Sequence, residues 1–235
     1  MPIKISTLSK KAKSGKTTAL ILTAGEYASQ GKKVLLIDAD PCQNLISWWK
    51  RCKDKDNVPS GIIMRTASTR KALDQIMSIE YEKFDIILID APAIEGALAN
   101  TIISNSDVII TPIQPAYDEI QAVSEAAETS ALIAEETGRP IPLVVYRTRI
   151  NIFNRGKPEY RFIRPFIENM RDNDYDAHLL KTELKERKCY REIRSGLGTL
   201  QMLKLTETVK KGRQEVKNFV RDIDAVLNQK TVVHC

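Results

Sequence analysis

Apolar residues form two patterns that alternate along the chain. Short apolar runs have the length of strands, and they occupy residues 3–8, 34–38, 61–65, 84–90, 107–112 and 141–146. The segments between them are longer and carry apolar residues at helical spacing, as in residues 17–30. Strands that alternate with helices are typical of βα units. The pattern therefore predicts an α/β fold, with a mainly parallel, twisted sheet and helices on both of its faces.

The length of the chain fits one domain. With 235 residues, 43% of them hydrophobic, the chain can bury one substantial core. It has no run of about 18 apolar residues and no secretory leader before the first predicted strand, so we expect a cytoplasmic protein. The four cysteines show no C-x-x-C spacing, which favours reduced thiols over a disulfide framework or a metal site.

Residues 8–20, LSKKAKSGKTTAL, carry the clearest chemical motif. Gly15, Lys16 and Thr17 end the pattern G-x-x-x-x-G-K-[ST], in which loop amides hold phosphate oxygens, the lysine neutralises them and the hydroxyl binds Mg²⁺. A predicted strand precedes the motif and a predicted helix follows it, so free amides and the helix dipole would face one anion. Lys10 replaces the first glycine of the pattern, which leaves a basic surface turn as the alternative.

Two further predicted strands end in carboxylates. Residues 34–38 end at Asp38, with Asp40 two positions later, and residues 84–90 end at Asp90. Ligands of open α/β sheets bind at the carboxyl ends of the strands, so these side chains are candidates to lie near a bound phosphate and its metal ion. Capping of the following helix is the alternative role for Asp38 and Asp40.

These segments together resemble the ParA/MinD family of ATPases, whose deviant Walker-A loop reads K-G-G-x-G-K-[ST]. Residues 11–18 read KAKSGKTT, with Lys11 five positions before Lys16 and with Ala12 and Lys13 in place of two glycines. A side chain at position 13 stands where glycine lets the backbone approach phosphate, and a left-handed conformation there costs about 1–2 kcal/mol. We expect the loop to be altered but competent.

The resemblance implies a P-loop nucleoside-triphosphatase fold that binds ATP and Mg²⁺ and hydrolyses ATP slowly. It implies that Lys11 reaches across an ATP-dependent homodimer to the phosphates of the partner, and that Asp40 positions the attacking water. The implied Mg²⁺ ligands and neighbours are Thr17, Asp38 and Asp90. The implied ATP-binding residues are Lys11, Ala12, Lys13, Ser14, Gly15, Lys16, Thr17 and Thr18, with Pro112 and Gln114 near the adenine.

The resemblance extends from Ile3 to about Leu227. Residues 182–197, TELKERKCYREIRSGL, look like the stretch T-x-[IL]-x-x-R-x-x-Y-x-x-[AIS] of small partition ATPases. We expect a single ParA-like domain over residues 1–235, without the helix-turn-helix domain of larger ParA proteins, as in the short ParA/ParF type and its relatives in conjugative DNA transfer. The implied partners are a second copy of the chain, DNA, and a ParB-like or relaxosome-type protein that stimulates hydrolysis.

Net charge is unevenly distributed along the chain. Residues 1–146 carry a net charge of −2 and residues 147–235 a net charge of +8. Residues 206–229 have the pattern of an amphipathic helix with a basic polar face. A docked terminal helix with a solvated basic face is one interpretation. We favour a site for the DNA backbone that reads no bases, formed by Arg187, Arg191, Arg194, Lys204, Lys210, Lys211, Arg213 and Lys217.

Three functions are compatible with the sequence. The leading one is a cytoplasmic, nucleoid-associated ATPase of DNA partition or conjugative transfer. A MinD-like membrane-positioning ATPase is the second, but the C-terminal end NQKTVVHC is short and follows Asp222 and Asp224, so we expect no stable membrane anchor. A metabolic relative is the third: an iron–sulfur reductase is disfavoured because no cluster-ligating cysteine follows Asp90, and a biotin-pathway ligase would need an acid pocket that we cannot identify. The altered loop also leaves open a nucleotide binder with weak hydrolysis.

Overall fold

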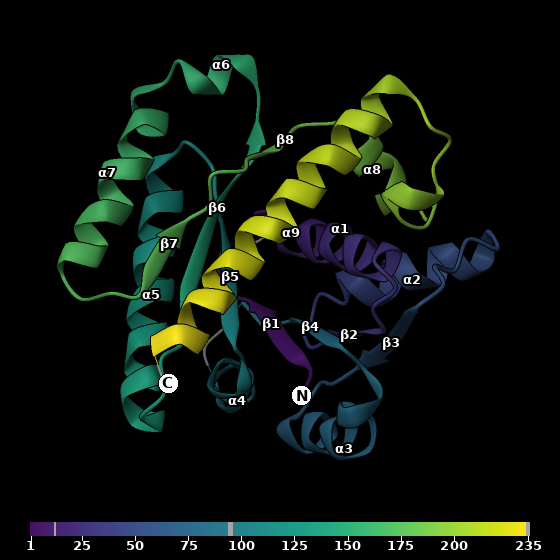
Figure 1. The fold of residues 1–235 in the computed structure, drawn as a ribbon, viewed down its shortest axis with the longest axis horizontal. Coiled ribbons are helices and arrows are strands. Elements are labelled where there is room, and N and C mark those ends of the chain that lie inside the picture. Colours follow the sequence, from purple (N-terminus) through teal and green to yellow (C-terminus); the bar gives the residue numbers. More distant parts are fainter. Residues whose placement is uncertain (12, 94–95, 234–235) are drawn as a thin grey trace.

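The computed structural model describes residues 1–11, 13–93 and 96–233, and side chains as far as residue 229 (Figure 1). The strands are β1 (Ile3–Thr7), β2 (Val34–Asp38), β3 (Ile62–Thr66), β4 (Ile86–Asp90), β5 (Val108–Ile113), β6 (Leu143–Ile150), β7 (Ala177–Leu179) and β8 (Leu184–Lys185). The α-helices are α1 (Lys16–Ser29), α2 (Asn44–Asp54), α3 (Arg70–Glu80), α4 (Ala97–Asn105), α5 (Tyr117–Thr137), α6 (Ile152–Arg155), α7 (Pro158–Asp172), α8 (Lys188–Arg194) and α9 (Glu207–Val233). Two 3₁₀ turns, η1 (Tyr81–Lys83) and η2 (Leu200–Met202), complete the described elements.

The strands form one parallel sheet in the order β3-β2-β4-β1-β5-β6-β7, and β8 pairs with the end of β6. In β2 and β4 every residue is buried, as expected for strands with helices on both faces. The parallel register places Asp38 directly opposite Asp90. Because parallel strands bring their carboxyl ends to one edge, both carboxylates stand at the same edge as the loop that follows β1.

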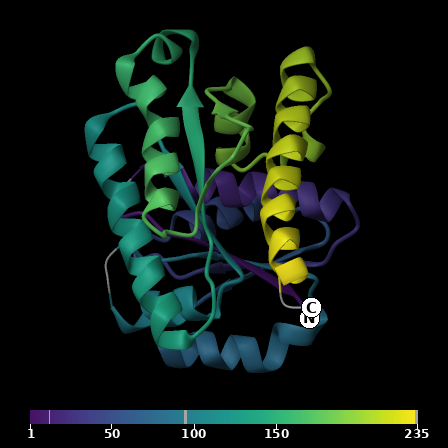
Figure 2. The same ribbon diagram turned by 60° about the vertical axis from the view of Figure 1, so that its left-hand side comes forward.

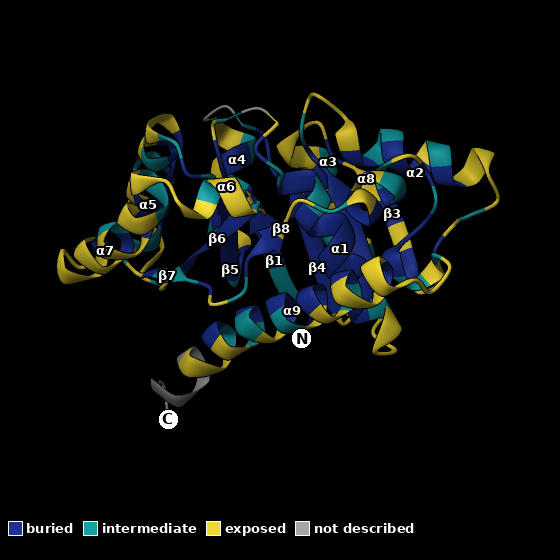
Figure 3. Cartoon of the chain, turned by 90° about the horizontal axis from the view of Figure 1, so that it is seen from above, coloured by how far each residue is buried: buried dark blue, intermediate teal, exposed yellow. Residues whose placement is uncertain are grey.

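Two layers of helices enclose the sheet. On one face α1, α2 and α9 pack against strand residues such as Leu36 and Leu88. On the other face α3, α4, α5 and α7 pack against the alternate positions, such as Ile37 and Val145. Figure 2 shows this layering from a second side. Figure 3 shows the buried residues gathered on the strands and on the sides of the helices that face them. The predicted fold class is confirmed.

The elements that the sequence predicts are found within a few residues of their expected bounds. The predicted helix 17–30 is α1, and the predicted terminal helix 206–229 is α9, which continues to Val233. The apolar pattern does not predict β7 and β8, which have three and two residues. Strands this short carry no apolar run that could be recognised.

Candidate active site

The loop between β1 and α1 has the geometry of an anion site. Gly15 has φ 114°, in the left-handed region, and a Cβ there would lie 3.3 Å from Thr148 Oγ1, so the position requires glycine. Lys13 also has a positive φ, 59°, and so adopts the strained conformation that the sequence analysis expected of it. Ala12, the other replaced glycine, lies outside the described residues.

The interior of the loop is polar and incompletely satisfied. Lys16 is 6% exposed, and its Nζ donates to the backbone oxygens of Ser9, at 2.9 Å, and Lys11, at 3.1 Å. Burial lowers the pKa of the Lys16 ammonium. Ser14 is 1% exposed, and its hydroxyl has no hydrogen-bond partner among the described residues. A buried cation and an unpaired hydroxyl in one tight loop fit a phosphate group, which would compensate both.

A hydroxyl and a carboxylate meet where a metal ion would lie beside that phosphate. Thr17 Oγ1 donates to Asp90 Oδ2 at 2.7 Å, and Thr7 Oγ1 donates to Asp90 Oδ1 at 3.0 Å. Asp90 is fully buried, and this burial raises the pKa of its carboxyl to about 6. Among the described residues no group of three or more His, Cys, Asp or Glu side chains could hold a metal ion. Mg²⁺ commonly uses one or two protein ligands together with phosphate oxygens and water, so Thr17 and Asp90 fit it.

The two carboxylates after β2 have different surroundings. Asp38 accepts from the amide of Ile46, at 2.8 Å, and from the amide of Asp40, at 3.2 Å, so it holds the start of α2. Asp38 therefore has the alternative role, which is to cap the start of α2. Its predicted role beside the metal ion stays a prediction. Asp40 is half-buried, accepts from the amide of Cys42 at 2.9 Å, and lines the cavity next to the phosphate loop.

This cavity has a volume of about 600 Å³. The loop from Lys13 to Thr18 forms one wall, and the ends of β6 and β8 with α8 form the opposite wall. The predicted adenine contacts, Pro112 and Gln114, are not among its lining residues: Pro112 is buried in β5 and Gln114 donates to Glu119 at 3.1 Å. Their role at the adenine stays a prediction.

Three arginines that the sequence pattern placed at DNA, Arg187, Arg191 and Arg194, line this cavity. Arg187 also pairs with Glu215 of α9 at 2.6 Å, so it lies beside that helix as well. The contacts of these arginines with DNA stay a prediction. Arg194 Nη1 donates to Thr18 Oγ1 at 3.4 Å, and burial lowers the pKa of its guanidinium. Arg149, with φ 52°, lines the same wall and was missed. It could have been found by the rule that singled out Asp38, because the run YRTRI also ends a parallel strand at the ligand edge.

Lys11 does not line the cavity. Its Nζ forms ion pairs with Asp118 and, at 2.9 Å, with Glu119, both at the start of α5 in the same chain. Asp118 is the largest cause of the raised pKa of Lys11. In the described chain the predicted trans-acting lysine is therefore held by its own α5.

The remaining basic residues near and on α9 divide into two groups. Lys204, Lys210, Lys211 and Lys217 are exposed, and Lys210 pairs with Glu207 at 2.9 Å. Arg213 is half-buried and donates to the backbone oxygens of Leu200, Gln201 and Leu203 at 2.9–3.2 Å. The guanidinium of Arg213 therefore has a structural role that the sequence analysis did not foresee.

Solved structures with a similar fold include a protein of plasmid partition and a protein of a cell division complex. A plasmid partition protein of Borrelia burgdorferi B31 bound to AMPPNP superposes with a TM-score of 0.64 at 15% identity, covering 94% of this chain and 99% of that chain. A chain of the MinC:MinD cell division protein complex of Aquifex aeolicus superposes with a TM-score of 0.67 at 18% identity, covering 95% and 96%. The predicted resemblance to ParA/MinD proteins is confirmed at the level of the fold.

Sequence comparison gives the family. Protein virC1 of Rhizobium radiobacter is 30% identical over 144 residues, and the match spans 60% of this chain but only 62% of the length of that relative. The VirC1 protein family matches residues 3–233. Because this match runs over nearly the whole sequence, the chain belongs to the VirC1 protein family.

Proposed function

We propose that this chain is a ParA-like ATPase that binds ATP with Mg²⁺, dimerises on ATP and binds DNA without sequence preference, in plasmid partition or conjugative DNA transfer. The observation that carries the proposal is the phosphate loop, with its buried Lys16 and with Thr17 2.7 Å from Asp90, at the edge of a cavity of about 600 Å³. Family membership and the fold of partition ATPases support the same role.

Different residues of the cavity would contact different parts of a bound triphosphate. The loop amides and Lys16 would bind the phosphate oxygens from one side, and Arg194 would add positive charge from α8 on the other. Bound Mg²⁺ would neutralise charge on the β- and γ-phosphates, held through Thr17 and Asp90. Asp40, half-buried in the cavity wall, would orient the water that attacks the γ-phosphate.

Dimerisation gives the proposed switch for DNA binding. Two copies of a weak basic surface, joined in one dimer, bind one DNA with an avidity about 10²–10⁴ times that of a single copy. Lys11 would leave Asp118 and Glu119 to reach the phosphates of the second copy. If this movement of Lys11 were energetically unfavourable, the chain would bind nucleotide and hydrolyse it only weakly. A ParB-like or relaxosome-type partner would then have to stimulate hydrolysis.

Within the part of the chain that is described, no helix is long and apolar enough to cross a bilayer.

Retention on immobilised DNA tests the proposal directly. The protein is loaded with ATP, with ADP or with no nucleotide and is eluted with rising salt. We expect the ATP form to elute at the highest salt, because only the dimer has paired basic surfaces. Equal elution in all three states would refute the ATP-dependent switch, and no retention in any state would refute DNA binding.

A further inference from the structure

Two large apolar side chains project from the end of the molecule at which the strands finish. Ile152 and Phe153 are the first residues of α6, the single helical turn that follows β6, and they are 80% and 83% exposed. Figure 1 shows α6 at the top of the molecule, beyond the end of β6. We call these two residues the α6 tip. Adjacent apolar side chains that are so exposed commonly mark an interaction site.

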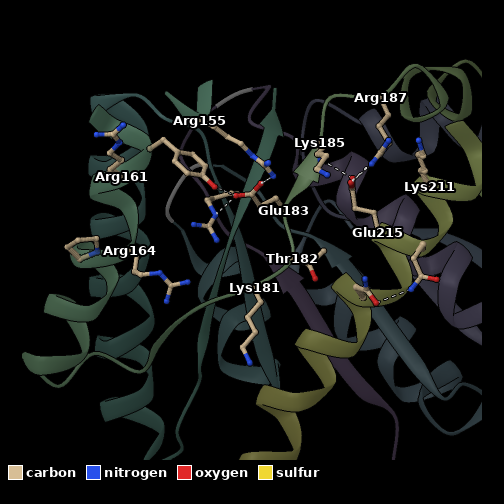
Figure 4. Close-up of a pocket in the computed structure, with 15 residues that line it drawn as sticks. Arg155, Arg161, Arg164, Lys181, Thr182, Glu183, Lys185, Arg187, Lys211 and Glu215 are labelled. Carbon is tan, nitrogen blue, oxygen red and sulfur yellow. Dashed lines mark hydrogen bonds and ion pairs between the residues drawn. The ribbon is translucent and has the colours of Figure 1, made fainter. Parts of the chain in front are cut away.

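The chain on both sides of the α6 tip is basic. Residues 149–161 contain four Arg or Lys and one Glu, which gives this segment a net charge of +3. Lys157 and Arg161 are exposed, and neither forms an ion pair among the described residues. In Figure 4 Arg161 extends from α7, and no hydrogen bond or ion pair joins it to the residues drawn. An apolar tip with basic flanks fits a surface that is apolar and acidic.

A pocket of about 740 Å³ lies at the opposite end of the molecule. Ile3 and Ile86, the first residues of β1 and β4, line it together with the C-terminal parts of α1 and α9. In a parallel sheet the strands begin at one edge and finish at the other, so this pocket and the α6 tip lie at opposite ends. Figures 1 and 2 agree, with α6 at the top and the N-terminus at the bottom. We call this concavity the basal pocket.

The lining of the basal pocket is aromatic and acidic. Its aromatic side chains are Tyr27, Tyr81 and Phe84. Its charged side chains, with a net charge of −2, are Lys32, Glu82, Asp85 and Asp224. Glu82 and Asp85 are exposed and form no ion pair among the described residues. The whole chain has a net charge of +6, so this pocket is an acidic site on a basic protein.

We propose that the α6 tip of one copy of the chain inserts into the basal pocket of a second copy, so that copies associate head to tail. Ile152 and Phe153 would pack against the aromatic rings of the pocket, and the basic flanks of the tip would face its carboxylates. A pocket of this volume is large enough to enclose two side chains. A contact between two α6 tips is disfavoured, because it would bring like charges together.

The contact joins two different surfaces, which determines how it propagates. Each pair of copies leaves one free tip and one free basal pocket, so the same contact can add a third copy and produces an open chain. The α6 tip and the basal pocket share no residue with the nucleotide cavity. Head-to-tail association therefore requires neither ATP nor DNA, and it is independent of the proposed function.

Two double variants each remove one side of the contact. Ile152→Ser/Phe153→Ser removes the apolar tip. Glu82→Lys/Asp85→Asn changes the net charge of the pocket lining from −2 to +1. Asparagine can still accept from the amide of Lys33, which lies 2.8 Å from the carboxylate of Asp85.

Two matched controls make the same changes elsewhere. Ile79→Ser/Leu132→Ser removes apolar side chains of α3 and α5 that are 56% and 62% exposed. Glu128→Lys/Asp172→Asn makes the same change in charge on α5 and α7. All eight substituted side chains are exposed, so we expect every variant to fold and to bind ATP like wild type, which a thermal melt and isothermal titration check.

Sedimentation velocity without nucleotide, over a series of protein concentrations, measures the association. The average mass of wild type should rise with concentration beyond two chains, and it should rise less at high salt. The tip variant and the pocket variant should each need at least about a tenfold higher concentration for the same average mass, and the controls should behave like wild type. An equimolar mixture of the tip and pocket variants should form pairs that grow no further, because only one intact tip and one intact pocket can meet.

Several results would overturn the head-to-tail contact. A wild type that stays monomeric or stops at two chains would do so, and binding of that protein to vesicles of anionic lipid would assign the α6 tip to a membrane surface instead. Association of the tip variant at wild-type concentrations, or a variant mixture that stays monomeric, would show that the tip does not enter the pocket. Equal loss of association in the controls would attribute it to the general surface of the protein. None of these results bears on retention of the ATP form by DNA.

Discussion

The ammonium nitrogen of Lys11 lies 2.9 Å from a carboxylate oxygen of Glu119 in the same chain. Glu119 is 1% exposed, and its Oε2 has no hydrogen-bond partner among the described residues. Gln114 donates to the other oxygen at 3.1 Å. A buried carboxylate is costly unless a cation pairs with it, so Lys11 stabilises the fold of the single chain. This contribution is independent of any contact that Lys11 makes across a dimer.

This pair changes how a Lys11 variant must be interpreted. Lys11→Ala leaves Glu119 buried without its cation, and we expect a loss of about 1–3 kcal/mol in the free energy of unfolding, measured by chemical denaturation. The double variant Lys11→Ala/Glu119→Gln should recover most of that loss. Both variants should still bind ATP and should lack hydrolysis. Recovery of hydrolysis in the double variant would show that Lys11 acts only on stability.

The phosphate loop can be tested at two neighbouring lysines. Lys16→Ala should abolish ATP binding in isothermal titration, because it removes the buried cation at the centre of the loop. Lys13→Gly is the matched control: Lys13 has φ 59°, so glycine relieves about 1 kcal/mol of backbone strain and should leave ATP binding in place. Loss of ATP binding in the glycine variant alone would mean that Lys13, and not Lys16, is the principal phosphate ligand.

Sequence patterns located the phosphate loop and the strand-end carboxylates because both depend on local order: a strand, a turn and a helix start, or a strand and its last residue. They could not assign Arg191 and Arg194 of α8, or Arg187, which directly precedes this helix. The spacing of these three arginines suits a basic helix face, and only the packing of the segment from β8 to α8 brings them to the cavity beside the phosphate loop. Asp118, one of the two partners of Lys11, lies 107 residues away along the chain, and sequence spacing carries no information about a contact at that separation.

Burial of Asp90 makes the stability of the nucleotide-free chain depend on pH. The pKa of its carboxyl is about 6 when folded, above the usual 3.8, so the folded chain holds this proton longer than the unfolded chain. The contribution to stability is therefore complete below about pH 4 and is lost as the pH rises through about 6. Asp90→Asn removes this dependence. Denaturant melts of both proteins should show wild type losing about 2–3 kcal/mol relative to the variant between those limits, and parallel curves would contradict the prediction.

Asp40 and Asp38 provide a matched pair for separating hydrolysis from folding. Asp40 lines the cavity, so Asp40→Ala should impair ATP hydrolysis, spare ATP binding and prolong the DNA-bound state, measured as a slower release from DNA. Asp38 holds the amides of Ile46 and Asp40, so Asp38→Ala should cost about 1–2 kcal/mol of stability. Hydrolysis at the wild-type rate in Asp40→Ala would remove this residue from the catalytic step.

Arg194 is the arginine best placed to contribute charge to the phosphates within one chain. Its guanidinium lies 3.4 Å from the Thr18 hydroxyl in the cavity wall, is half-buried, and has no carboxylate partner among the described residues. Arg191 lies one turn earlier on α8, but it is exposed and lies 3.6 Å from Glu186. We therefore expect Arg194→Gln to weaken ATP binding about tenfold, since it removes a charge-assisted contact, and Arg191→Gln to change it little. Titration of both variants with ATP, alongside anisotropy with duplex DNA, makes the comparison. If Arg194→Gln kept wild-type ATP affinity and lost DNA affinity instead, the result would contradict this prediction. It would support the role at DNA that the sequence pattern suggested for Arg194.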